Sequence, residues 1–162
     1  MKTLKKAVCA VLALMMVMSL AACEDSGSKE PDPVNLSTCS MNDLVGYLTA
    51  KGYIAEGTTP VDINTTEGYH KDNTGGSVPV VAWADNAKDY GGIWLFWWDM
   101  ENQTDAYSNY QFASQNSGNL LYGGGAASLA TSSLRGAFAI AFAENYADAD
   151  AVLAAFNALP VN

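Results

Sequence analysis

The hexapeptide Ile93–Trp98, IWLFWW, constrains the fold more than any other part of the chain, because all of its residues are apolar and most are aromatic. Side chains alternate between the two faces of a strand, so Trp94, Phe96 and Trp98 would share one face and the residues between them the other. Both faces are therefore apolar, which is typical of a central strand covered on both sides. We predict a strand over 92–98.

Helical patterns occur in three other parts of the chain. In the first, Ser40 stands three residues before Asp43, as in a capping box, and apolar residues then recur at helical spacing. The other two follow residues suited to a helix start and end at Gly or Pro. We expect helices over 41–51, between Thr104 and Gly118, and from Asp148 or Asp150 to Pro160.

Segments with β-branched residues or strict alternation predict the strands. The clearest alternation places Phe138, Ile140 and Phe142 on one side of a strand. Residues 84–92 are expected to turn the chain, and residues 126–135 fit either a helical turn or a strand. The expected strands are 78–84, 92–98, a short one in 119–125, 136–145 and a further short one within 60–64.

The resulting order is α-β-β-α-β-β-α. Pairs of strands joined by tight turns, with helices between and around them, indicate an antiparallel or mixed sheet covered on one side. We therefore predict an α+β two-layer sandwich with about four strands and about three helices, broadly ferredoxin-like.

The first 22 residues have the pattern of a signal peptide. Three lysines, Lys2, Lys5 and Lys6, precede 14 residues without charge, Ala7–Leu20. This apolar stretch is shorter than the roughly 20 residues that a membrane-spanning helix needs, but it has the length of a signal-peptide core. We therefore expect the protein to be exported to the extracytoplasmic side of the cell membrane.

The sequence LAAC, Leu20–Cys23, follows the apolar stretch. Here the chain resembles the bacterial lipoproteins, whose lipobox has an aliphatic residue, two small residues and a cysteine. The resemblance covers residues 1–23 and implies cleavage before Cys23, acylation of Cys23 with diacylglycerol and palmitate, and attachment to the extracytoplasmic face of the cell membrane. Several acyl chains on one residue make such an anchor stable. An ordinary secretory signal cut after Ala22 is the alternative.

The rest of the chain divides into a tether and one domain. Residues 24–37 are rich in Ser, Pro and charge, which is typical of a flexible linker. The predicted organisation is a signal peptide over 1–22, a lipidated cysteine and tether over 23–37, and a single α+β domain over 38–162.

The mature chain is strongly acidic. Removing residues 1–22 removes three of the eight basic residues and none of the 17 acidic ones, so the formal net charge becomes −12. A nucleic-acid partner would require a basic surface, and this charge argues against one. The charge favours solubility and would attract a cationic partner.

Few residues are suited to catalysis or metal binding. Cys39 is the only thiol of the mature domain and His70 is the only histidine, so neither a zinc site nor an internal disulfide is expected. Asp72, Asp148 and Asp150 lack the ligand series of a calcium loop. We expect no metal and no cofactor.

Acidic residues follow the aromatic strand directly. Asp99, Glu101 and Asp105 would suit a glycan-degrading enzyme, which uses a pair of carboxylates. A strand end followed by a helix start also selects such residues. We expect the second explanation, and no catalytic residues.

Four aromatic residues are the candidates for binding: Trp83, Trp94, Phe96 and Trp98. They would be covered by the domain itself, by a protein partner or a second copy of the chain, or by the rings of a glycan. A protein-interaction role is the first hypothesis and cell-surface carbohydrate binding the alternative, with glycan hydrolysis by Asp99 and Glu101 as a third.

Overall fold

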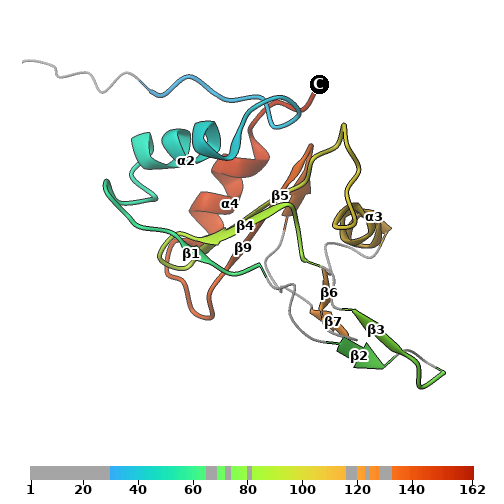
Figure 1. Cartoon of the computed structure of the whole chain (residues 1–162). Helices are drawn as coiled ribbons and strands as arrows, with labels where there is room; N and C mark the ends of the chain where they lie inside the picture. The colour runs from blue at the N-terminus through green and yellow to red at the C-terminus, as the bar shows by residue number, and fades with distance from the viewer. Residues whose placement is uncertain are drawn as a thin grey trace, which may run out of the picture. The chain divides into compact units, whose positions relative to one another are not determined.

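A five-stranded antiparallel sheet forms the centre of the fold, and helices pack against it (Figure 1). The computed structural model describes residues 30–64, 69–71, 74–79, 82–115, 120–122, 125–127 and 133–162. All of these except Glu30 belong to one compact unit, Pro31–Asn162. The strands of the sheet follow the order β1 (Val61–Asp62), β4 (Asn86–Asp89), β5 (Ile93–Trp97), β9 (Phe138–Phe142) and β8 (Ser133–Arg135).

Two short hairpins and three helices complete the described part of the chain. The hairpins are β2 (Tyr69–Lys71) with β3 (Ser77–Pro79), and β6 (Leu120–Tyr122) with β7 (Gly125–Ala127). The helices are α2 (Met41–Ala50), α3 (Tyr107–Gln115) and α4 (Ala149–Asn157). The α+β class predicted from the sequence is confirmed. Of the expected strands, those at 92–98, at 136–145 and within 60–64 contribute to the five-stranded sheet, whereas β3 and β6 lie in the separate hairpins.

The strand order differs from a ferredoxin-like one. Each of the hairpins β4–β5 and β8–β9 forms between neighbours in sequence, and the two hairpins meet along β5 and β9. All four pairings in the sheet are antiparallel. The helical connection from β5 leads to β8, which runs parallel to β5 because β9 lies antiparallel between them.

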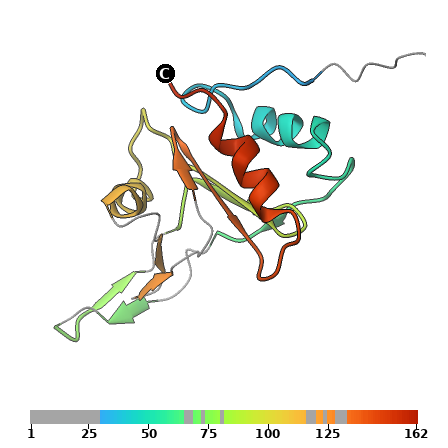
Figure 2. The same cartoon turned by 180° about the vertical axis from the view of Figure 1, so that it is seen from behind.

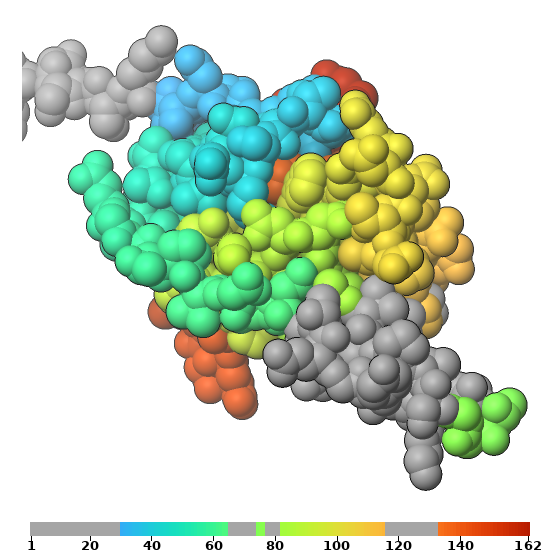
Figure 3. Space-filling view, viewed as in Figure 1, coloured from blue at the N-terminus to red at the C-terminus, as the bar shows by residue number. Residues whose placement is uncertain are grey.

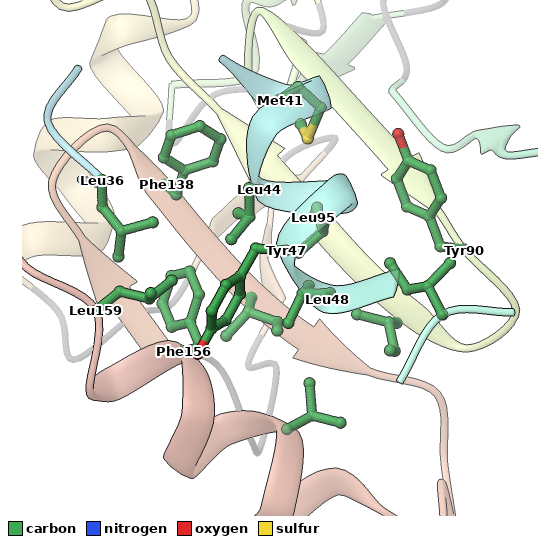
Figure 4. Packing of buried hydrophobic residues seen from close by; sticks show 14 of the residues in the cluster. Leu36, Met41, Leu44, Tyr47, Leu48, Tyr90, Leu95, Phe138, Phe156 and Leu159 are labelled. Atoms are coloured by element: carbon green, nitrogen blue, oxygen red, sulfur yellow. The ribbon is translucent and has the colours of Figure 1, made fainter. Parts of the chain in front are cut away.

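Helices α2 and α4 cover one face of the sheet, which we call the first face and which carries Leu95 and Ile140 (Figures 2 and 4). Leu44 of α2 and Phe156 of α4 have no exposed surface, and neither have the two strand residues beneath them. Burial of large apolar side chains stabilises a domain by about 1.5–3 kcal/mol each. This layer is the principal core.

The capping box predicted for α2 is confirmed. The Ser40 hydroxyl accepts a hydrogen bond from Asp43 N (3.2 Å), and Ser40 N donates to Asp43 Oδ2 (2.8 Å). Hydrogen bonds from the Ser40 hydroxyl and amide lower the pKa of the Asp43 carboxyl. Helix α4 begins at Ala149 after Asp148, which occupies the cap position without a capping hydrogen bond from its side chain.

Residues 84–92, expected to form a turn, contain strand β4. The turn itself is short: Tyr90 N donates to Ile93 O (2.8 Å), and Gly91 and Gly92 have φ of 71° and 103°. Two consecutive positive φ angles match the tight hairpin turn that pairs neighbouring strands, and glycine adopts them at little cost. The strand was missed because alanine, asparagine, lysine and aspartate have low β propensity.

The strand expected over 78–84 is shorter than predicted. Residues Ser77–Pro79 form β3, whereas Trp83 and Ala84 lie in a bend that leads into β4. The uncertain segment 126–135 contributes to β7 and β8, and residues 128–132 lie outside the described ranges.

The tether predicted to extend to residue 37 ends earlier. Leu36 has no exposed surface and packs in the principal core. Its N donates to Pro160 O (2.9 Å), and its O accepts from Ala137 N (3.1 Å). Figure 3 shows this N-terminal segment in blue beside the C-terminal residues in red. The folded domain therefore includes residues before 38, and Val34 of the same segment also packs against this core.

Candidate functional site

Strand β5 and the residue after it, Trp98, divide their side chains between two clusters, as the alternation predicted. Ile93 and Leu95 lie in the principal core under α2 and α4, whereas Phe96 and Trp98 lie in a second cluster on the opposite face, which we call the second face. All four have no exposed surface. Both faces of the strand are thus covered over most of its length.

Small residues surround the aromatic side chains of the second face. In the sheet, Phe96 is flanked by Ala87 of β4 and Ala139 of β9. Alanines leave the space above the sheet that the large rings occupy, and Ala106 and Ala113 beside and within α3 complete the cluster. These alanines bring α3 close to the sheet. Nothing in the sequence marks them as part of an aromatic cluster.

The aromatic rings follow one another across this face. Ring centroids are separated by 5.7 Å between Trp83 and Phe96 and by 6.4 Å between Phe96 and Trp98. Tyr110 of α3 meets Trp98 edge to face at 5.6 Å and stacks on Tyr107 at 5.5 Å. Such spacings are those of packed aromatic pairs. Phe96 and Trp98 therefore pack against other aromatic rings of the same domain.

Polar bonds hold Trp98 in place. Its indole Nε1 donates to Trp83 O (3.0 Å), and its backbone N donates to Ala137 O (3.0 Å). The neighbouring Asn109 of α3 is buried and donates through Nδ2 to Ala82 O (2.7 Å). Sequence reasoning missed Asn109, because a helical asparagine between polar neighbours reads as a surface residue.

Trp83 and Trp94 differ from the other two candidates, because each retains some exposed surface. Trp94 lies at the end of β5 nearest the tight turn, where it pairs with Asp89 of β4 and Ala141 of β9. Its Nε1 is buried and has no hydrogen-bond acceptor in the described part of the chain. Of the four candidate residues, Trp83 and Trp94 are those that a partner can reach directly.

Among the acidic residues after β5, Asp99 is hydrogen-bonded within its own loop. The Asp99 carboxylate accepts hydrogen bonds from Glu101 N (3.1 Å) and Asn102 N (3.0 Å), and from Asn102 Nδ2 (2.6 Å). Hydrogen bonds from Asn102 lower the pKa of Asp99. A general acid requires a raised pKa instead. The Asp99 carboxylate therefore stabilises the turn after β5, whereas the helix start expected here lies further along the chain, at Tyr107.

The remaining candidates for chemistry are dispersed. Cys39 is a free, half-buried thiol, and burial, with a smaller contribution from Asp43, raises its pKa to about 11. Its thiolate is thus scarce at neutral pH, which makes it a poor nucleophile. No group of three or more His, Cys, Asp or Glu side chains within the described ranges could hold a metal ion.

The N-terminal signals and one calcium candidate lie outside the described residues. These are the signal peptide over 1–22, the lipidation residue Cys23 and Asp72. The side chain of His70 is likewise not described. None of the helices in the described ranges has the length and apolar composition needed to cross a membrane.

Comparisons of the chain with protein families, curated proteins and solved structures found no match.

Proposed function

We propose that this chain is a lipid-anchored binding protein on the extracytoplasmic face of the cell membrane, and that its partner is a basic protein. The charge balance carries the proposal. The mature chain has 17 acidic residues and a formal net charge of −12. Lys88 is engaged with Asp62 (2.7 Å) and Arg135 with Leu159 O (2.9 Å), so these two cations already have partners within the fold. A cationic surface would be steered toward the domain.

The anchor is proposed from the lipobox at Leu20–Cys23. Replacing Cys23 with Ser removes the thiol to which the lipid would be attached. We expect the wild-type chain to sediment with membranes and to incorporate labelled palmitate, and the Cys23→Ser chain to do neither. Cys39→Ser is the matched control and should behave like the wild type. Equal palmitate incorporation by the Cys23→Ser chain would overturn the anchor.

Binding to basic proteins is tested by calorimetry with purified cationic cell-wall hydrolases. We expect binding that weakens strongly between about 20 and 200 mM salt, because exposed charges are screened over about 8–10 Å at physiological ionic strength. Acidic proteins of the same size serve as the control. If no basic protein binds, or if basic and acidic proteins bind equally, a basic partner is the wrong proposal.

Carbohydrate binding is the second candidate function, and the partial exposure of Trp83 and Trp94 favours it. Flat aromatic side chains offer an apolar surface on which a sugar ring can stack. A glycan array separates the two candidates, since a carbohydrate-binding domain would give signals that disappear in Trp83→Ala and Trp94→Ala variants and vary little with salt.

A further inference from the structure

Strands β1, β4 and β5 lie side by side at one edge of the sheet (Figures 1 and 2). One residue from each forms a row across the second face, close to the turn between β4 and β5. Val61 of the edge strand β1 pairs with Asp89 of β4, which in turn pairs with Trp94 of β5. Residues directly opposite each other in an antiparallel sheet point to the same face. Val61, Asp89 and Trp94 thus stand side by side.

The row is open to a partner. Val61 is 62% exposed, which is the largest value among the big apolar residues of the described chain. Asp89 and Trp94 are each partly exposed. Because the Trp94 Nε1 is buried, the indole presents carbon atoms to the outside. The surface therefore combines an aromatic ring, a carboxylate and an aliphatic side chain.

The Asp89 carboxylate keeps one oxygen available. Its Oδ1 accepts a hydrogen bond from Gly92 N (2.6 Å), and Oδ2 has no partner within the described part of the chain. Its neighbour Lys88 points to the opposite face, where it pairs with Asp62 (2.7 Å). The negative charge of Asp89 is therefore not neutralised by the nearest lysine.

The carboxylate and the ring are close together. Tyr90 and Ile93 form the hydrogen-bonded pair next to the turn (2.8 Å), so Asp89 and Trp94 are the following, non-hydrogen-bonded pair. The Cα atoms of a non-hydrogen-bonded pair are about 4.5 Å apart, and its side chains lie closer together than those of a hydrogen-bonded pair. One planar cation could contact both.

We propose that Val61, Asp89 and Trp94 form a docking site for an arginine side chain of the basic protein partner. A guanidinium group stacks on an aromatic ring and hydrogen-bonds to a carboxylate in the same plane, whereas its methylene groups pack on an aliphatic residue. The negative charge favours this occupant over a neutral sugar, and over a second copy of the same acidic chain. The inference rests on the proposed function and names the contact through which it would operate.

The test uses the full chain, labelled with ¹⁵N, in a zwitterionic detergent, and follows the indole N–H signals of its four tryptophans. A Trp94→Phe variant identifies the Trp94 signal. The probe is the peptide acetyl-(Gly-Arg)₃-amide, and the same peptide with citrulline in place of arginine is the neutral control of equal shape. We expect the arginine peptide to shift the Trp94 signal, and the citrulline peptide to leave it unchanged.

Two aspartate variants then separate the site from the overall charge. Asp89→Asn retains an oxygen for the Gly92 N–H but loses the charge, and we expect the arginine peptide to bind about tenfold more weakly. Asp105→Asn removes the same charge from an exposed position before α3. Here we expect a change of less than about twofold, since isolated surface charges contribute little.

Each contrary result has a distinct meaning. Equal loss in the two aspartate variants, or equal binding of the citrulline peptide, would overturn the docking site. A Trp94 shift with neutral chitin oligosaccharides but not with the arginine peptide would replace it by a sugar site. If basic proteins bind the wild type and Asp89→Asn equally well, the basic partner stands and the arginine site is wrong. If no basic protein binds the wild type, the proposed function itself has failed.

Discussion

Replacing Trp98 with Ala is expected to lower the free energy of unfolding by about 3–5 kcal/mol, the usual cost of removing a buried tryptophan. Trp98 has no exposed surface and is among the largest fully buried side chains of the described chain. It contacts the rings of Phe96 and Tyr110 and donates to Trp83 O (3.0 Å). Its removal leaves a cavity between the sheet and α3. Urea denaturation followed by circular dichroism measures the loss.

Trp94→Ala is the matched control, because it removes the same side chain from the same extended segment, 93–98, at a partly exposed position. We expect this loss of stability to be less than half of that for Trp98→Ala, since part of the side chain already faces water. Equal losses would mean that Trp94 is as deeply embedded in the fold as Trp98, and would contradict the distinction between a structural and an accessible tryptophan.

Replacing Gly136 with Ala is expected to lower the free energy of unfolding by about 2–4 kcal/mol. Part of this loss arises because alanine is unfavourable in the left-handed backbone conformation, and part because Leu36 loses some of its packing. Gly136 has φ of +55°, and a Cβ atom there would lie 2.5 Å from Leu36 O. The obstructing atom belongs to the backbone, so the segment before α2 has to move. Thermal or urea unfolding gives the total cost, and hydrogen exchange of the Ala137 amide, which donates to Leu36 O, reports the displacement.

Gly57→Ala provides the comparison for Gly136. Gly57 has φ of +75°, but a Cβ atom there would meet nothing within 4 Å. The backbone penalty of about 1–2 kcal/mol should therefore remain without any displacement of Leu36. If both variants lose the same stability and the Ala137 amide stays protected in each, Leu36 is not held by the close approach at Gly136.

Much of the fold could be predicted from the sequence, because local patterns coincide with burial. Phe138, Ile140 and Phe142 alternate in the sequence and face the principal core together. The capping residues Ser40 and Asp43 mark the beginning of α2, since their hydrogen bonds are made within one turn. Such features depend on residues close together in the chain.

Other parts of the fold depended on contacts between distant residues. Strand β4 has little β propensity, and its place is given by pairing with β1 and β5. Leu36 lies in a stretch typical of linkers, yet it hydrogen-bonds to Pro160 and Ala137. Asn109 is buried, and its side chain donates to Ala82 O, which is 27 residues away in the chain. No local pattern distinguishes these residues from surface residues of the same type.

The sequence by itself determined which side chains of Ile93–Trp98 share a face, because alternation is a property of the extended backbone. It also determined the charge, and hence the kind of partner that we propose. Only the tertiary structure decided that Trp98 is covered by α3 and that Trp94 keeps an exposed edge next to Asp89. Exposure depends on what packs above a residue, and that is decided by strand register and helix placement rather than by the residue's neighbours in the chain.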